Sequence, residues 1–169
     1  MDKFEDDATA ARACQLAAAA AELGTWGVGA VLVDESGGTL SEGANEVFVN
    51  DFRSDFHAEM VVLNRFESGC TDNISPAELT LVSTLEPCPM CTARLIYAGI
   101  GSVRYICEDP LGGMVTRLSS LPPKLFQMSE ALSQSWAQTD CSRELRDAAH
   151  HILEHSRDEM DQRIVDRGR

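Results

Sequence analysis

The sequence predicts an α/β fold, a three-layer α/β/α sandwich in which helices cover both faces of a mixed central sheet. Three observations predict it. Helical and strand patterns alternate along residues 8–107, a short turn joins the first two strand segments, and a helical segment separates the next two. A tight turn makes neighbouring strands antiparallel and a helical crossover makes them parallel, so the sheet should be mixed.

The first half of the chain predicts a helix, a strand hairpin and a second helix. Alanine-rich residues 8–23 favour a helix, which Gly24 would end. The β-branched segment 28–33 predicts a strand, and turn-forming residues connect it to a returning strand over 39–45. Residues 57–66 then carry apolar side chains at helical spacing.

A strand–helix–strand unit follows, with strands over 79–84 and 103–107 and a helix over 89–98 between them. After residue 110 the pattern weakens. We expect a short helix over 129–136, capped by Ser129, and a long final helix capped by Asp140. The apolar face of that final helix would contain Leu145, Ala149, Ile152, Met160 and Ile164. We expect a single domain over 1–169, with a core over about 8–128 and a helical extension over about 129–169.

The charge balance argues for a small, neutral substrate. The chain has 27 acidic and 14 basic residues, which gives a formal net charge of -13. Lys and Arg supply most of the affinity for nucleic-acid phosphates, and a surface this acidic would repel them. We therefore expect a small molecule as the partner, and not a nucleic acid.

The termini and the cysteines indicate a cytoplasmic protein. The first seven residues are acidic and lack the apolar region of a secretory signal, and no apolar run approaches membrane-spanning length. Without a signal peptide, the Cys88–Cys91 pair predicts metal chemistry and not a disulfide. The other thiols are expected to be packing residues: Cys14, Cys70, Cys107 and Cys141.

The chemistry is concentrated in two short motifs, His57-Ala58-Glu59 and Pro87-Cys88-Pro89-Met90-Cys91. Zinc accepts imidazole nitrogen and thiolate sulfur in a tetrahedral shell. Cys88 and Cys91 are spaced to share one face of a helical turn, at a helix start where the backbone dipole favours thiolates. His57, which also begins a helix, would be the third ligand.

Three protein ligands leave a fourth position for water, the pattern of catalytic zinc sites. Glu59 is two residues from His57, so its carboxylate can approach that water without ligating the metal. A structural zinc site or a thioredoxin-like redox pair would be the simpler reading. The first leaves Glu59 and the missing fourth ligand unexplained, and the second leaves His57 unused.

Together these motifs resemble the zinc-dependent deaminases of the cytidine deaminase-like superfamily, whose signature is H-x-E followed by P-C-x-x-C. Residues 81–105 resemble the branch of guanine deaminases, tRNA adenosine deaminases and fungal-type cytosine deaminases. The resemblance covers about residues 8–109. It implies the cytidine deaminase-like fold, a homodimer, and one zinc ion per subunit held by His57, Cys88 and Cys91.

The resemblance also implies hydrolytic deamination of a nucleobase or nucleoside, with Glu59 as the catalytic proton shuttle and ammonia as a product. Guanine is slightly favoured and cytosine is next. The alternatives are a tRNA adenosine deaminase and, from another class, a non-catalytic zinc-binding scaffold.

Four substrate-binding candidates follow from the comparison with the family. Asn45 stands where the branch places a substrate-binding asparagine, although a strand-end turn residue would look the same. Trp26 and Phe56 depart from the usual pattern, so they could form the pocket wall or stack on a base, or simply pack in the core. Asp109 follows a strand that should end at the pocket, or lies in a solvated loop. The final helix is expected to cover the pocket, as C-terminal segments do in some relatives.

Overall fold

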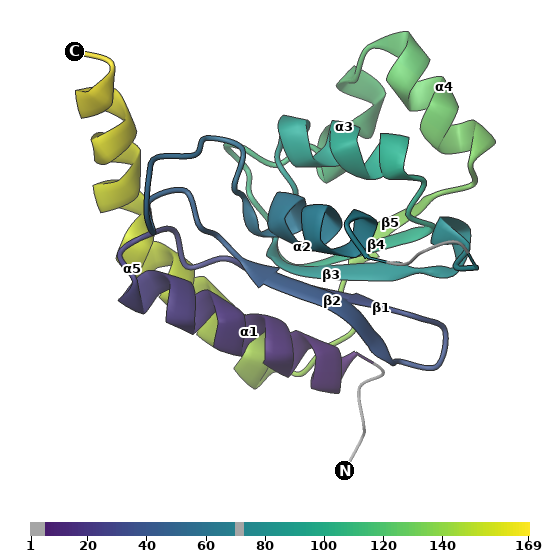
Figure 1. Cartoon of the computed structure of the whole chain (residues 1–169), viewed down its shortest axis with the longest axis horizontal. Coiled ribbons are helices and arrows are strands. Elements are labelled where there is room, and N and C mark those ends of the chain that lie inside the picture. The colour runs from purple at the N-terminus through teal and green to yellow at the C-terminus, as the bar shows by residue number, and fades with distance from the viewer. Residues whose placement is uncertain (1–5, 70–72) are drawn as a thin grey trace.

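A computed structural model describes residues 6–69 and 73–169, and it confirms the predicted three-layer fold. Five strands form one mixed sheet in the order β2-β1-β3-β4-β5. Helices α1 and α5 cover one face, and α2, α3 and α4 lie over the other (Figure 1). In chain order the helices and strands are α1 (Asp7–Glu22), β1 (Gly29–Val33), β2 (Thr39–Ala44), α2 (Ala58–Glu67), β3 (Thr80–Leu85), α3 (Pro89–Ala98), β4 (Ser102–Cys107), α4 (Pro123–Ala131), β5 (Ser135–Gln138) and α5 (Arg143–Arg167).

The strand directions match the sequence expectations for the first four strands. β1 pairs antiparallel with β2 and with β3, and β3 pairs parallel with β4. The crossover helix α3 ends at Gly99, whose φ of 72° favours glycine over other residues. Because β3 and β4 are parallel neighbours, the segments that follow them begin at the same edge of the sheet. These segments carry Cys88 and Asp109.

The core fills both interfaces of the sheet. Between the sheet and α2 and α3, fully buried apolar side chains from five elements pack together, including Leu32, Leu63, Leu81 and Leu95. On the other face, α1 approaches β1 so closely that a Cβ at Gly29 would collide with the backbone of the helix. A glycine at this position therefore permits the contact between α1 and the sheet.

The prediction of a short helix over 129–136 is wrong. These residues contain the end of α4 and the start of β5, a fifth strand that pairs parallel with β4. The helix begins earlier because Pro123 suits a first helical position, and it ends where Ser133 adopts a φ of 53°. The indole of Trp136 then donates a hydrogen bond to Ser129 Oγ, 2.9 Å away, which ties the strand back to the helix.

The long final helix is confirmed, with differences in its cap and its buried face. Ser142, and not Asp140, occupies the N-cap position. The helix buries Ala149, Leu153, Ser156 and Met160, whereas Ile164 is exposed. Two of the expected apolar positions are therefore buried, and a serine is buried with them because its hydroxyl bonds the backbone N–H of Gly27. The division into a core over 8–128 and an extension over 129–169 stays a prediction.

The cysteines outside the Cys88–Cys91 pair are packing residues wherever the structure describes them. Cys14, Cys107 and Cys141 are buried free thiols, and burial raises the pKa of Cys14 and of Cys107 to about 11. Cys70 lies outside the described residues. Among the described residues, no helix is both long and apolar enough to cross a membrane.

Replacing Leu81 by alanine tests the packing of the central strand. Leu81 is fully buried in β3, so the cavity left by Leu81→Ala should lower the free energy of unfolding by about 2–5 kcal/mol in urea denaturation. Leu23→Ala is the matched control, because Leu23 is 63% exposed and its loss should change stability by less than about 0.5 kcal/mol. Equal stabilities of the two variants would contradict this packing.

Candidate metal centre and adjoining cavity

The structure brings His57, Cys88 and Cys91 together at the start of two helices. His57 is the N-cap residue of α2, Cys88 is the N-cap residue of α3, and Cys91 lies in the first turn of α3. His57 Nδ1 is 3.7 Å from each of the two sulfur atoms, and the three ligand atoms all lie within 4.8 Å of one another. The motifs that are separated in the sequence therefore form one cluster.

This donor set fits a tetrahedral zinc ion. Bonds of about 2.0–2.3 Å to nitrogen and sulfur at tetrahedral angles place neighbouring ligand atoms about 3.5–3.8 Å apart. The distances from the imidazole to the thiols fall in that range. Imidazole and thiolate ligands also bind zinc in preference to magnesium or calcium, which favour oxygen ligands.

Electrostatics at the cluster favour a thiolate. Hydrogen bonds from Cys91 and then from His57 lower the pKa of Cys88 to about 4, against the opposing effect of burial. The helix dipole of α3 acts in the same direction at its N-terminus. Burial alone would lower the pKa of His57, but the hydrogen bond and charge of Cys88 raise it. The hydrogen bond to Cys88 and burial raise the pKa of Cys91, so the thiolate of this pair lies on Cys88.

Glu59 lies beside the cluster in a buried position. Its Oε1 accepts a hydrogen bond from Ser83 Oγ at 3.1 Å, and its Oε2 accepts one from Cys91 Sγ at 3.4 Å. Burial, and then the charge of Cys88, raise the pKa of this carboxyl. The carboxylate is thus fixed next to the metal ligands and is a base within reach of a bound molecule.

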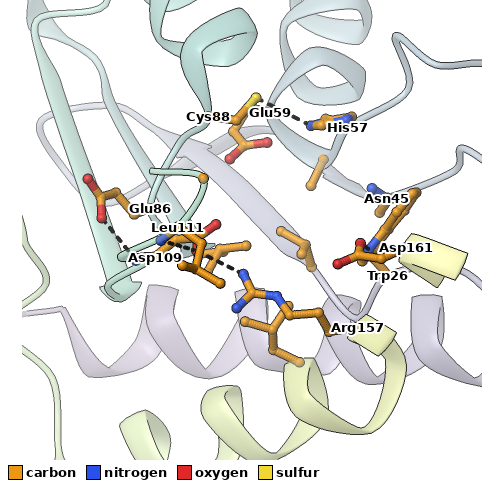
Figure 2. A pocket seen from close by; sticks show the side chains of 15 residues that line it. Trp26, Asn45, His57, Glu59, Glu86, Cys88, Asp109, Leu111, Arg157 and Asp161 are labelled. Atoms are coloured by element: carbon orange, nitrogen blue, oxygen red, sulfur yellow. Dashed lines mark hydrogen bonds and ion pairs between the residues drawn. The ribbon is translucent and has the colours of Figure 1, made fainter. Parts of the chain in front are cut away.

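A cavity of about 350 Å³ adjoins these residues and is large enough for a small heterocycle. Figure 2 shows His57, Glu59 and Cys88 along one side of it, with Asn45 and Trp26 beside them and Asp109 and Arg157 across from them. Its wall is built from β-strand ends, from loops and from α5. The lining residues are Trp26, Val28, Asn45, His57, Ala58, Glu59, Leu85, Glu86, Cys88, Asp109, Leu111, Gly112, Leu153, Arg157 and Asp161.

Asn45 lines the cavity with its amide oriented by the protein. Its Oδ1 accepts hydrogen bonds from Thr25 Oγ1 and from the backbone N–H of Val47. Because the oxygen is occupied, the Nδ2 group is the part of the amide that remains to donate to a ligand. This geometry suits the predicted substrate contact.

Trp26 also lines the cavity, in contact with both the helix α5 and a neighbouring loop. Its Nε1 donates to Asp161 Oδ1 at 3.0 Å, and its ring stacks on Phe48 with centroids 5.5 Å apart. The residue is therefore part of the pocket wall and not simply of the hydrophobic core. Its indole N–H is already used, so it offers a ligand only its apolar surface.

Phe56 does not line the cavity, so the expected stacking on a base is not supported by its position. The guanidinium of Arg53 lies over the Phe56 ring, 4.1 Å from its centroid. Phe56 instead lines a separate hollow, together with Glu46, Asn50, Asp51 and Arg53.

Asp109 is a buried wall residue and not part of a solvated loop. Its backbone N–H donates to Glu86 Oε2 at 2.9 Å, and its own carboxylate forms an ion pair with Arg157. Glu86 also accepts hydrogen bonds from the backbone and side chain of Thr116. This buried glutamate thus holds the loop after β4 against the site, a role that its position before Pro87 did not reveal.

The largest contribution that sequence reasoning missed comes from α5. Leu153, Arg157 and Asp161 occupy one stripe of this helix and line the cavity, so the expectation that the final helix covers the pocket is confirmed. Their spacing of four residues is a usable signal, because such residues share a helix face. An arginine and an aspartate in line with the buried Leu153 on one helix face would have indicated a polar cavity wall.

One protein-family model matches more than half of the chain. Residues 4–107 match the cytidine and deoxycytidylate deaminase zinc-binding region. This segment contains all three members of the metal cluster and Glu59.

Two relatives illustrate the range of similar proteins. The chain is 33% identical over 118 residues to a tRNA-specific adenosine deaminase of Bacillus subtilis, which covers 69% of the chain and 71% of the relative. It is 36% identical over 110 residues to a tRNA(Ile)-lysidine synthase of Deinococcus radiodurans. That match covers 64% of the chain, but the chain spans only 18% of the length of the synthase.

Solved structures support the fold. One, from a study of A-to-I editing by tRNA:A34 deaminases, has a TM-score of 0.67 and 26% identity, covering 86% of the chain and 99% of that structure. Another, a guanine deaminase from Nitrosomonas europaea, has a TM-score of 0.69 and covers 92% of the chain and 87% of that structure. At 22% identity, the second similarity establishes the shared fold alone.

Removing a ligand should remove the metal. We expect about one zinc ion per chain in elemental analysis of the protein, and a small fraction of that in His57→Ala and Cys88→Ala. His151→Ala is the control, because this histidine is exposed on α5 and away from the cluster. Full zinc content in both ligand variants, with far-UV circular dichroism unchanged, would contradict the assignment of this site.

Proposed function

Because the chain belongs to the family of zinc-dependent deaminases defined by the cytidine and deoxycytidylate deaminase zinc-binding region, we propose that it hydrolytically deaminates a small aminated nucleobase or nucleoside. Guanine is the slightly favoured substrate, and cytosine is the next. His57, Cys88 and Cys91 are proposed as the zinc ligands and Glu59 as the catalytic residue.

One observation carries this proposal: two members of the metal cluster, His57 and Cys88, a buried carboxylate and an oriented amide line one cavity. Structural zinc sites are closed by four protein ligands, whereas this cluster has three and adjoins open space. A scaffold function would need neither Glu59 beside the ligands nor Asn45 with a free amide group. The cavity is also the right size for a free base, and it is partly apolar in its lining.

The residues of the chain divide the work of the reaction. When bound, zinc supplies the Lewis acid that lowers the pKa of a water molecule and makes it a nucleophile at neutral pH. Glu59 accepts a proton from the attacking water and donates it to a ring nitrogen. The Glu59 carboxylate next takes the second proton of that water from the added hydroxyl group and passes it to the amine, so the C–N bond breaks and ammonia leaves as the C–O bond becomes a carbonyl.

Other residues of the cavity wall are proposed to orient the substrate. Asn45 Nδ2 is proposed to donate to a ring nitrogen or carbonyl, and Trp26 to supply a flat apolar surface. Asp109 is proposed to bind N–H groups of the base through the carboxylate oxygen that the ion pair leaves open.

The charge of the lining supports a neutral substrate. Four carboxylates reach the cavity, from Glu59, Glu86, Asp109 and Asp161, against the single guanidinium of Arg157. A phosphate inside this cavity would meet strong repulsion at low local dielectric. A base or nucleoside avoids that cost, and this agrees with the net charge of -13 over the whole chain.

A tRNA adenosine deaminase is the second candidate, favoured by the similarity to the Bacillus subtilis enzyme of that name. In such a substrate only the base would enter the cavity, and the phosphates would lie against the surface. The acidic balance of the chain argues against this, because counterion release depends on Lys and Arg contacts.

A substrate panel separates these candidates. Ammonia release would be measured with guanine, cytosine, adenine, their nucleosides and a tRNA anticodon stem-loop. Turnover of a free base or nucleoside supports the proposal. Efficient turnover of the stem-loop alone would replace it with the tRNA alternative, and ammonia from none of them would favour the scaffold.

Substituting Glu59 tests the catalytic assignment. Glu59→Gln removes the base but keeps the shape, so kcat should fall about 10²- to 10⁴-fold while zinc content stays unchanged. Glu22→Gln, at the exposed end of α1, is the control and should retain full activity. Unchanged turnover in Glu59→Gln would be the result expected of a non-catalytic zinc scaffold, and loss of both zinc and fold would indicate a structural role.

We also propose a homodimer, as expected for this branch. Helix α3 presents large apolar side chains to solvent, with Tyr97 63% exposed and Met90 also exposed on the same helix. A second copy covering α3 would remove this surface from water. Light scattering measures the mass directly, and a monomer at micromolar concentration would contradict the dimer.

A further inference from the structure

Among the residues that the structure describes, Arg157 contributes the one guanidinium of the cavity wall, and it has no part in the proposed reaction. It comes from α5, more than 60 residues after the metal ligands in the chain. Arg157 Nη2 lies 3.0 Å from Asp109 Oδ1, and the two side chains are 29% and 9% exposed. Figure 2 shows the pair across the cavity from Glu59 and Cys88.

The ion pair leaves binding capacity on both partners. It occupies one nitrogen of the guanidinium, and the remaining N–H groups form no hydrogen bond with the described residues. On Asp109, Oδ1 accepts the ion pair and the backbone N–H of Leu111, and Oδ2 has no hydrogen-bonding partner in the described part of the chain. The wall therefore presents a carboxylate acceptor directly beside guanidinium donors.

An acceptor beside a donor complements a ligand edge that carries a donor beside an acceptor. In an aminated heterocycle a lactam, a ring N–H next to a carbonyl, is such an edge, and its oxygen extends beyond the ring and can accept from more than one N–H group, unlike the ring nitrogen of an amidine edge. Guanine and cytosine carry such an edge, and adenine does not. The carboxylate would accept from the N–H and the guanidinium would donate to the carbonyl, and both bonds are strengthened because the protein partner is charged.

A phosphate or carboxylate is a poorer match for Arg157. An anion bound to the open N–H groups of Arg157 would lie beside the Asp109 carboxylate, and the two negative charges would repel each other. Three further carboxylates line the same cavity. The lining therefore disfavours a ligand that carries a phosphate or carboxylate. It favours a neutral lactam edge that hydrogen-bonds both Arg157 and Asp109.

We propose that Arg157, paired with Asp109, is a specificity-determining residue that selects aminated heterocycles bearing a lactam edge. The inference rests on the proposed deaminase function and deepens it: the substrate class is oxo-bearing amino-purines and amino-pyrimidines.

A purely structural role for Arg157 makes a different prediction. The ion pair could serve only to fasten α5 over the cavity. However, α5 is fastened there by other contacts: Ser156 Oγ accepts from the Gly27 N–H at 2.9 Å, and Arg163 Nη1 donates to the Gly24 carbonyl at 2.7 Å. The helix does not depend on Arg157 alone, so the two roles can be separated by substitution.

The experiment compares matched substrates that keep the amine and lose the lactam. Guanine is paired with 2-aminopurine, and cytosine with 4-aminopyrimidine. We would measure kcat/KM for both members of each pair in the zinc-loaded wild type, in Arg157→Met and in Arg157→Lys. Arg163→Met is the control, because it loosens the same helix while leaving the cavity lining intact. Zinc content and thermal midpoint are recorded for every variant.

The diagnostic quantity is kcat/KM for the lactam substrate divided by kcat/KM for its partner that lacks the lactam. The two substrates differ in intrinsic reactivity, but this difference is the same in every variant, so a change in the ratio reports on the protein. We expect this ratio to fall about 10- to 100-fold in Arg157→Met, by the loss of a charged hydrogen bond, and to be unchanged in Arg163→Met. Arg157→Lys keeps a cation beside Asp109 and should show a smaller fall, which gives a second measurement if the methionine variant does not fold.

Two failures are distinguishable. If the wild type turns over these bases and the ratio stays the same in both Arg157 variants, or both members of a pair lose activity equally, Arg157 only fastens the helix and the inference is rejected. If the zinc-loaded wild type turns over no member of either pair, the inference is rejected. Ammonia release from a nucleoside or from adenine would then keep the proposed function, and ammonia from no substrate of the panel would reject that function as well.

Discussion

The meeting of two helix N-termini is the constraint on which the rest of the site depends. His57 and Cys88 both occupy N-cap positions, with extended backbone before the helix begins. Their side chains therefore leave the two helices at the points where the backbone dipoles are positive, and where thiolate is the favoured form. The parallel pairing of β3 and β4 and the packing of α2 on β1 and β2 hold these two helix ends within bonding distance of one ion.

The charged groups concentrated at this point are stabilised by hydrogen bonds from neighbouring residues and not by solvent. A buried carboxylate, two thiols and an imidazole would be unfavourable together without hydrogen bonds and a cation. Ser83 and Cys91 bond Glu59, and Asp109 and Thr116 bond Glu86. The second glutamate is the less obvious one, because it carries no chemistry itself and instead fixes the loop that forms the opposite wall.

The sequence was sufficient for the parts of the molecule whose residues signal their own conformation. The alanine-rich α1, the Pro89 start and Gly99 end of α3, and the spacing of His57, Cys88 and Cys91 are all local patterns, and they predicted both the elements and the cluster. β5 was missed because four residues with mostly exposed side chains show no periodicity, and only pairing with β4 makes them a strand. Arg157 and Asp161 were missed for a similar reason. Their partners, Asp109 and Trp26, are distant in sequence, and no local pattern states which face of a long polar helix will meet a cavity.

The position of α5 has a consequence for how this protein could diversify. The proposed zinc ligands and Glu59 lie within 57–91, while Leu153, Arg157 and Asp161, from a single helix near the other end of the chain, form part of the cavity wall. Substitutions along one stripe of that helix change the shape and charge of the cavity, and they leave the metal ligands and the central strands unchanged. Selectivity and catalytic power can therefore drift under separate selection, and the same reactive centre can be retained while lineages exchange one amine-bearing ring for another.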